Sequence, residues 1–201
     1  DNAYLLSRSG WSALRERIGG VLADYHRQYP LRAGMPREEL KSRLQRKGII
    51  WPPRLFYEII ARALAEGVLA EGEGTVHAPD HAVRFTLEQQ RRVDELRMTF
   101  RRNPTAPPSV TEAAAIVGAD VLQALIEQGT LVKASEDVVF LREDYDRMVA
   151  GVLALIQAQG SITVAQVRDR FHTSRKYALA LMEHLDERKV TRRVGDARVL
   201  R

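Results

Sequence analysis

Residues 185–200 read LDERKVTRRVGDARVL, and the same plan occurs at 125–141 (LIEQGTLVKASEDVVFL) and at 63–77 (ALAEGVLAEGEGTVH). Each copy reads as the end of a helix followed by a short strand, a turn and a second strand. When Gly67, Gly129 and Lys189 are aligned, the copies lie 62 and 60 residues apart. The recurrence predicts three related modules.

The sequence around the last copy predicts the rest of the module. Thr163 is a natural N-cap for VAQVRDRF, and Thr173 or Ser174 for the helix that follows, whose apolar residues recur at i, i+3, i+4 and i+7. Gly195-Asp196 then forms the two-residue turn that tight hairpins prefer. A longer helix precedes this group, with an apolar stripe from Tyr145 to Ile156.

Three helices and a hairpin in about 60 residues are the winged-helix plan. We therefore expect a mainly α fold with small β-hairpins, built as tandem winged-helix (helix-turn-helix) domains. The predicted domains are a first module at 1–85, a middle module at 86–146 and a last module at 147–201. A stripe from Trp11 to Tyr25 predicts the leading helix of the first module.

Composition excludes several classes of protein. The 201 residues (22.7 kDa) are 45% apolar and contain no Cys, which rules out disulfides, thiolate zinc sites and Cys nucleophiles. The longest uncharged stretch, 148–167, is apolar only in its first half, and no secretory signal precedes it. We expect a soluble, cytoplasmic monomer without membrane contact. Because the chain starts at Asp1 rather than Met, we also expect a fragment of a longer protein.

The positive charge is concentrated in the last third of the chain. Residues 151–201 carry 10 basic and 5 acidic side chains, against 8 and 11 for 86–150 and 13 and 10 for 1–85. Such a distribution favours a polyanion as the partner of the last module. The acidic middle module is, by its charge, a poor RNA binder.

Two basic groups in the last module should meet in space. Arg175 and Lys176 lie in the first turn of a helix, where the helix dipole disfavours cations, and a phosphate there would reverse that effect. The hydroxyls of Thr173 and Ser174 would be further donors to the phosphate. Separately, the predicted hairpin register places Arg193 opposite Arg198, and two like charges in that position repel unless an anion lies between them.

Other interpretations of these residues stay open. Surface cations are usually solvated, and Asp186, Glu187 and Asp196 are near enough in sequence to pair with some of them. Tyr177 and Phe171 could stack on a base, but their helical spacing suits a core role equally well.

Catalytic and metal sites find little support. His77 and His81 have a ligand-like spacing but lie in a Pro-containing loop, and Gly72 and Gly74 form a turn rather than a phosphate loop. We find no P-loop, zinc-protease or serine-hydrolase motif. The sequence therefore predicts no enzyme, no catalytic residue and no metal ligand in this chain.

At the last module the residues become specific for a family. The run FHTSRKYALALMEHLDERKVTRRVGDARVL at 171–200 resembles the C-terminal winged helix of bacterial selenocysteine-specific elongation factors, which are relatives of elongation factor Tu. A second run, YHRQYPLRAGMPREELKSRL at 25–44, is similar to the second winged helix of the same family. The middle module matches the family mainly by its position between these two modules. The resemblance implies modules two to four of a four-module extension, with a remnant of the first at residues 1–8.

The resemblance also implies a function. The terminal module of this family binds the selenocysteine insertion element, an mRNA hairpin, so that the factor delivers selenocysteyl-tRNA at UGA codons on the ribosome. GTP and Mg²⁺ would bind in domains upstream, since the full-length proteins are GTPases, and this fragment itself would need no cofactor. The matching RNA-binding positions are Ser174, Arg175, Lys176, Tyr177, Arg192, Arg193, Gly195, Asp196 and Arg198.

Two rival functions share the predicted fold. A tandem winged-helix DNA-binding regulator would insert the third helix of the module into the major groove of B-form DNA. A protein-docking scaffold would use the same fold without nucleic acid. Lys189 departs from the glycine of the other two copies, and a left-handed residue there would cost about 1 kcal/mol.

Overall fold

The computed structural model describes residues 6–45, 51–72 and 74–201. The chain divides into two compact units, 1–84 and 85–201. Residues 1–5, which make up most of the predicted remnant of an earlier module, lie outside the described residues. Among the helices that the structure describes, none is both long and apolar enough to cross a bilayer.

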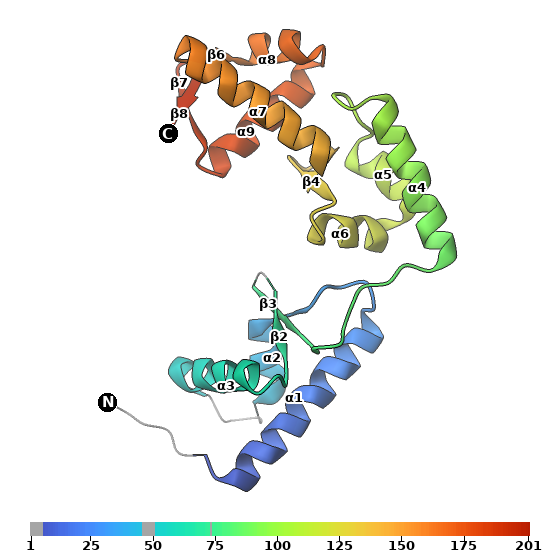
Figure 1. The fold of residues 1–201 in the computed structure, drawn as a ribbon, viewed down its shortest axis with the longest axis vertical. Helices are drawn as coiled ribbons and strands as arrows, with labels where there is room; N and C mark the ends of the chain where they lie inside the picture. The colour runs from blue at the N-terminus through green and yellow to red at the C-terminus, as the bar shows by residue number, and fades with distance from the viewer. Residues whose placement is uncertain (1–5, 46–50, 73) are drawn as a thin grey trace. The chain divides into compact units, whose positions relative to one another are not determined.

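The first unit follows the winged-helix plan (Figure 1). In chain order its elements are α1 (Arg8–Gln28), β1 (Met35–Pro36), α2 (Arg37–Leu44), α3 (Pro53–Ala65), β2 (Ala70–Glu71) and β3 (Thr75–His77). The antiparallel sheet has the order β1-β3-β2. Ile18, Leu22, Met35 and Leu40 are fully buried in the core between the helices and this sheet.

The second unit contains two further copies of the plan. The middle one consists of α4 (Leu87–Arg102), α5 (Val110–Val117), α6 (Ala119–Glu127), β4 (Leu131–Lys133) and β5 (Val139–Leu141). The last one consists of α7 (Arg142–Gln159), β6 (Ile162–Thr163), α8 (Val164–Phe171), α9 (Arg175–Glu187), β7 (Thr191–Val194) and β8 (Ala197–Leu200). The predicted tandem winged-helix fold is confirmed.

The hairpin of the middle copy shares one core with the last copy. Helix α7 begins at Arg142, directly after β5 ends at Leu141, and runs from the middle hairpin to β6 (Figure 1). Buried side chains of the middle hairpin, such as Phe140, belong to the same cluster as Met148 of α7 and Leu181 of α9. The second unit is therefore held together by apolar packing across both copies.

The three aligned turns adopt the same backbone conformation. Gly67, Gly129 and Lys189 have φ angles of 65°, 71° and 60°, which lie in the left-handed region. After the turn, the N–H of Val68 donates to the carbonyl of Ala63 and that of Val190 to Leu185, at 2.8 and 2.9 Å. Both bonds end the preceding helix in the manner of a Schellman motif. The predicted alignment of the copies is thus confirmed at its three anchoring residues.

The sheets contain a strand that the sequence analysis does not predict. In the first and last copies a two-residue strand before the second helix, β1 or β6, pairs with the last strand of the hairpin. At the corresponding place in the middle copy there is an isolated bridge between Ser109 and Val138. A strand of two residues is too short to show an alternating apolar pattern, which explains why the sequence does not reveal it.

Candidate nucleic-acid interface

The start of α9 presents an exposed cation. Ser174 is the N-cap residue with extended backbone, and within the described residues its side chain makes no capping hydrogen bond. The first turn contains no acidic residue, and the exposed Arg175 has no ion-pair partner in the described part of the chain. The helix thus begins with a free guanidinium beside backbone N–H groups, as the sequence predicts.

The wing has the predicted register. Arg193 faces Arg198, Arg192 faces Val199 and Val194 faces Ala197, across a turn in which Gly195 has a φ of 61°. The side chain of Arg193 is 65% exposed, and its Nε donates to the carbonyl of Gly195 at 2.8 Å. This short bond holds the Arg193 side chain close to the turn.

The helix start and the wing meet at one hollow, which we call the wing hollow. It measures about 490 Å³ and is lined by Thr163, Val164, Ala165, Arg175, Leu179, Glu183, Arg193, Asp196 and Arg198. Arg175, Leu179 and Glu183 follow each other at four-residue steps along α9, so they lie on one face of the helix. The expected convergence of the two basic groups is confirmed for Arg175 and Arg193.

Arg198 departs from the prediction. Its side chain is only 5% exposed, and its Nε donates to Oδ2 of Asp186 at 3.1 Å. The expectation that Arg193 and Arg198 need an external anion between them is therefore wrong, because Asp186 already supplies a counter-charge to Arg198. The pairing with a nearby carboxylate, weighed as an alternative, is what the structure shows.

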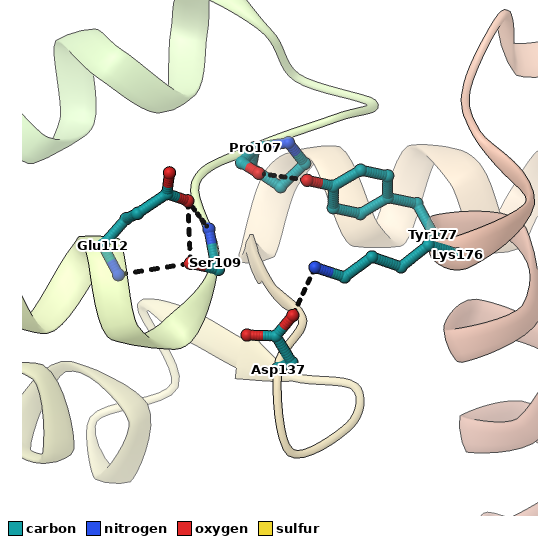
Figure 2. A network of polar contacts seen from close by, with 6 residues as sticks. All are labelled: Pro107, Ser109, Glu112, Asp137, Lys176 and Tyr177. Carbon is teal, nitrogen blue, oxygen red and sulfur yellow. Dashed lines mark hydrogen bonds and ion pairs between the residues drawn. The ribbon is translucent and has the colours of Figure 1, made fainter.

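Lys176 and Tyr177 point toward the middle copy (Figure 2). The Nζ of Lys176 donates to the carboxylate of Asp137, and this hydrogen bond raises the pKa of Lys176 above its ordinary value. The hydroxyl of Tyr177 donates to the carbonyl of Pro107 at 2.7 Å, and its ring packs edge-on against Phe140. Tyr177 thus takes the core role that the sequence analysis weighed against base stacking.

The segment that receives these contacts is itself ordered by a cap. The Ser109 hydroxyl accepts from the backbone N–H of Glu112 at 3.2 Å, and one Glu112 carboxylate oxygen accepts from the Ser109 N–H at 2.8 Å (Figure 2). The hydroxyl bond from Ser109 is the main reason that the pKa of Glu112 is lowered. Thr173 donates its hydroxyl to the carbonyl of Thr105, so the start of α9 is tied to this segment at a further point.

Of the remaining predicted positions, Asp196 lines the wing hollow and Arg192 does not. Asp196 approaches Arg193, with Oδ1 of the acid 3.8 Å from Nη2. Arg192 is exposed on β7. The sequence analysis missed Glu183 and Asp137. The four-residue spacing from Arg175 could have indicated Glu183, but Asp137 comes from another module and carries no local signal.

Three histidines of the first unit, His26, His77 and His81, contact backbone groups through their rings. His26 stacks on His81 with ring centroids 3.5 Å apart, and His26 Nε2 accepts from the N–H of Ala78 at 3.2 Å. The His81 Nε2 lies 2.8 Å from the carbonyl of Arg32, and His77 Nδ1 lies 2.9 Å from that of Ala78. These ring nitrogens therefore serve the backbone, and in the described ranges we find no group of His, Asp and Glu suited to hold a metal.

Comparisons with known proteins agree with this architecture. Two sequence models described as "Elongation factor SelB, winged helix" match residues 20–77 and 154–200, and they are labelled as the second and third winged helix of that factor. Selenocysteine-specific elongation factors of Desulfomicrobium baculatum and Escherichia coli are each 27% identical over 186 and 194 residues, which is 90% and 93% of this chain. The chain spans about 30% of the length of these relatives.

Two solved structures are similar as well. One is the mRNA-binding domain of elongation factor SelB from E. coli in complex with SECIS RNA, with a TM-score of 0.48 and 26% identity over 58% of this chain and 99% of that one. The other is a bacterial selenocysteine-specific elongation factor, with a TM-score of 0.49 and 16% identity over 96% of this chain and 30% of that one. The two SelB winged-helix models together match residues near both ends of the chain, and the listed relatives align with 90% and 93% of it. We conclude that the chain belongs to the selenocysteine-specific elongation factor (SelB) family.

Proposed function

We propose that this chain binds the selenocysteine insertion hairpin of an mRNA through the wing hollow. The observation that carries the proposal is that Arg175 of α9 and Arg193 of the wing line the same hollow. Neither guanidinium forms an ion pair shorter than 3.8 Å with a described carboxylate, so both are available to phosphates. Membership of the SelB family supports RNA as the nucleic acid.

The shape of RNA explains how such a site would work. The major groove of an A-form helix is too narrow for side chains to read, so α9 would not enter it as the recognition helix of a DNA-binding protein does. Arg175 and Arg193 would instead grip the backbone of the stem, and unpaired bases of the hairpin would give specificity. Recognition should then depend on the hairpin.

The wider role follows from the family. We place the chain in a longer factor that delivers selenocysteyl-tRNA to the ribosome at UGA codons in the cytoplasm, with GTP and Mg²⁺ bound in domains outside this chain. The names and greater length of the relatives support this assignment. In that factor the chain would serve as the RNA-binding arm, without catalytic residues of its own.

A titration with three nucleic acids tests the proposal. The chain is titrated at one salt concentration with SECIS RNA hairpin, a scrambled RNA of the same length and a DNA duplex of the same sequence. We expect the tightest binding to the hairpin. Equal or tighter binding to DNA would favour the DNA-binding regulator, and no binding to any of the three would favour a docking scaffold.

A further inference from the structure

The carboxylate of Asp186 joins the end of α9 to both strands of the wing. Its Oδ1 accepts from the hydroxyl of Thr191, on β7, at 2.6 Å, and its Oδ2 accepts from Arg198, on β8, at 3.1 Å. Thr191 and Arg198 are both buried, with 2% and 4% of their surface exposed. A single acidic side chain at the end of the helix thus accepts hydrogen bonds from both strands of the hairpin.

The position of this carboxylate is unfavourable for the helix itself. Asp186 lies in the last turn of α9, where the carbonyl end of the helix dipole repels negative charge. The buried guanidinium of Arg198, in turn, would be strongly destabilised without an anionic partner. Each charge therefore depends on the other, and their pairing explains why both are present.

The pairing also fixes the geometry of the wing hollow. Arg198 is the cross-strand partner of Arg193, so anchoring Arg198 sets the position of the strand that bears Arg193. Arg175 lies at the opposite end of the helix that bears Asp186. Asp186 thereby links the helix that bears Arg175 to the hairpin that bears Arg193, although its own carboxylate does not line the wing hollow.

We propose that Asp186 is a positioning residue for RNA binding, an inference that rests on the proposed function. Through Thr191 and Arg198 it orders the wing before RNA arrives, so that less freedom is lost on binding. It also neutralises Arg198, which leaves Arg175 and Arg193 as the phosphate contacts. The expected benefit is a preference for the hairpin over other RNA, because an unfixed cation binds any phosphate.

The test compares Asp186→Asn with Glu187→Gln, which removes the same charge from the neighbouring residue at the same end of α9. Affinities for SECIS RNA hairpin and for a loop-free RNA duplex are measured over a range of salt concentrations, at a temperature where both variants are folded. For Asp186→Asn we expect the hairpin preference to fall by roughly tenfold. The slope of log K against log salt should steepen by about 0.7–0.9, since Arg198 becomes available to a phosphate.

Glu187→Gln should leave both quantities at the wild-type values. A third variant, Thr191→Val, keeps the ion pair and removes one hydrogen bond, so it should lower the hairpin preference without changing the salt slope. Hydrogen exchange of the amides of β7 and β8 should become faster in Asp186→Asn and stay unchanged in Glu187→Gln.

The outcomes separate the two proposals. If Asp186→Asn only lowers the unfolding temperature, with hairpin preference and salt slope unchanged, Asp186 is merely structural and the inference fails. In that case the proposed function still stands, provided that Arg193→Gln weakens hairpin binding. A wild-type chain that does not prefer the hairpin would overturn both.

Discussion

The hydroxyl of Tyr177, at the start of α9, donates a hydrogen bond of 2.7 Å to the carbonyl of Pro107, which precedes α5 of the middle copy. The bond is partly buried and joins residues 70 positions apart in the chain. Together with the Lys176–Asp137 pair, it places one side of the α9 start against protein. Arg175, from the same helix start, instead lines the wing hollow with residues of the wing, where a ligand can reach it.

This arrangement predicts that Tyr177 contributes more to stability than to RNA affinity. Replacement of Tyr177 by Phe removes one partly buried hydrogen bond and leaves the ring in place, so the free energy of unfolding should fall by about 0.5–1.5 kcal/mol. Urea unfolding measures this change. Tyr57→Phe, on a side chain that is 63% exposed, is the matched control and should have no effect. A Tyr177→Phe chain with full stability and weakened hairpin binding would contradict the assignment.

The exposed cations of the wing hollow, Arg175 and Arg193, should govern the salt dependence of RNA binding. The double variant Arg175→Gln, Arg193→Gln removes two groups that line the wing hollow, and the slope of log K against log salt should become shallower by about 1.4–1.8. Lys176→Gln should change the slope less, because Asp137 already neutralises that charge. Equal slopes for the double variant and the wild type would argue against phosphate binding by the wing hollow.

The left-handed turn at Lys189 predicts a stabilising substitution. Lys189 has a φ of 60°, a conformation that glycine adopts without a Cβ penalty, so Lys189→Gly should raise the free energy of unfolding by about 0.5–1 kcal/mol. Gly129, at the same place in the middle copy, has a φ of 71°, and Gly129→Ala should lower the stability by a similar amount. Chemical denaturation of both variants provides the comparison. A loss of stability in Lys189→Gly would show that the lysine side chain makes a compensating contribution.

The pKa of His26 makes the first unit sensitive to acid. Burial, assisted by the neighbouring His81 and His77, lowers the pKa of His26 from its ordinary 6.5 to about 4. The unfolded chain therefore binds more protons than the folded one between pH 6.5 and 4, and stability is lost as the pH falls through this window. Since the ring is only partly buried, we expect a loss of roughly 1–2 kcal/mol.

Unfolding of the wild type and of His26→Gln should be compared from pH 7.5 to 4. Glutamine retains an acceptor for the N–H of Ala78 but does not titrate, so the variant should lose less stability than the wild type over this range. Parallel pH profiles for the two chains would show that another group causes the acid sensitivity. One such group is His184 in the second unit, whose pKa is also lowered by burial.

The features that sequence revealed are those with a local pattern. The repeated helix end, the turn at Gly195 and the N-cap at Thr163 each depend on a few adjacent residues, and the structure confirms them. The opposition of Arg193 and Arg198 follows from the turn length alone, and it too is confirmed.

The charge partners could not be predicted in the same way. Asp137 and Lys176 are 39 residues apart, and their pairing depends on how the middle hairpin packs against α9. For Arg198 the sequence contains several nearby carboxylates that could form the ion pair. In the structure the guanidinium is buried and pairs with Asp186. A pattern of charges in a sequence gives the number of cations near a site, but packing determines which of them remain free.

The direct passage from β5 into α7 has a practical consequence for anyone who wishes to produce a minimal RNA-binding protein from this chain. No spacer separates Leu141 from Arg142, and Phe140 is buried among side chains of α7 and α9. A chain that starts at Arg142, where the last copy begins, would lack the middle hairpin, so the apolar surface that packs against Phe140 would be exposed to solvent and would promote aggregation. The shortest version that retains its interior starts at Phe85, where the second unit begins.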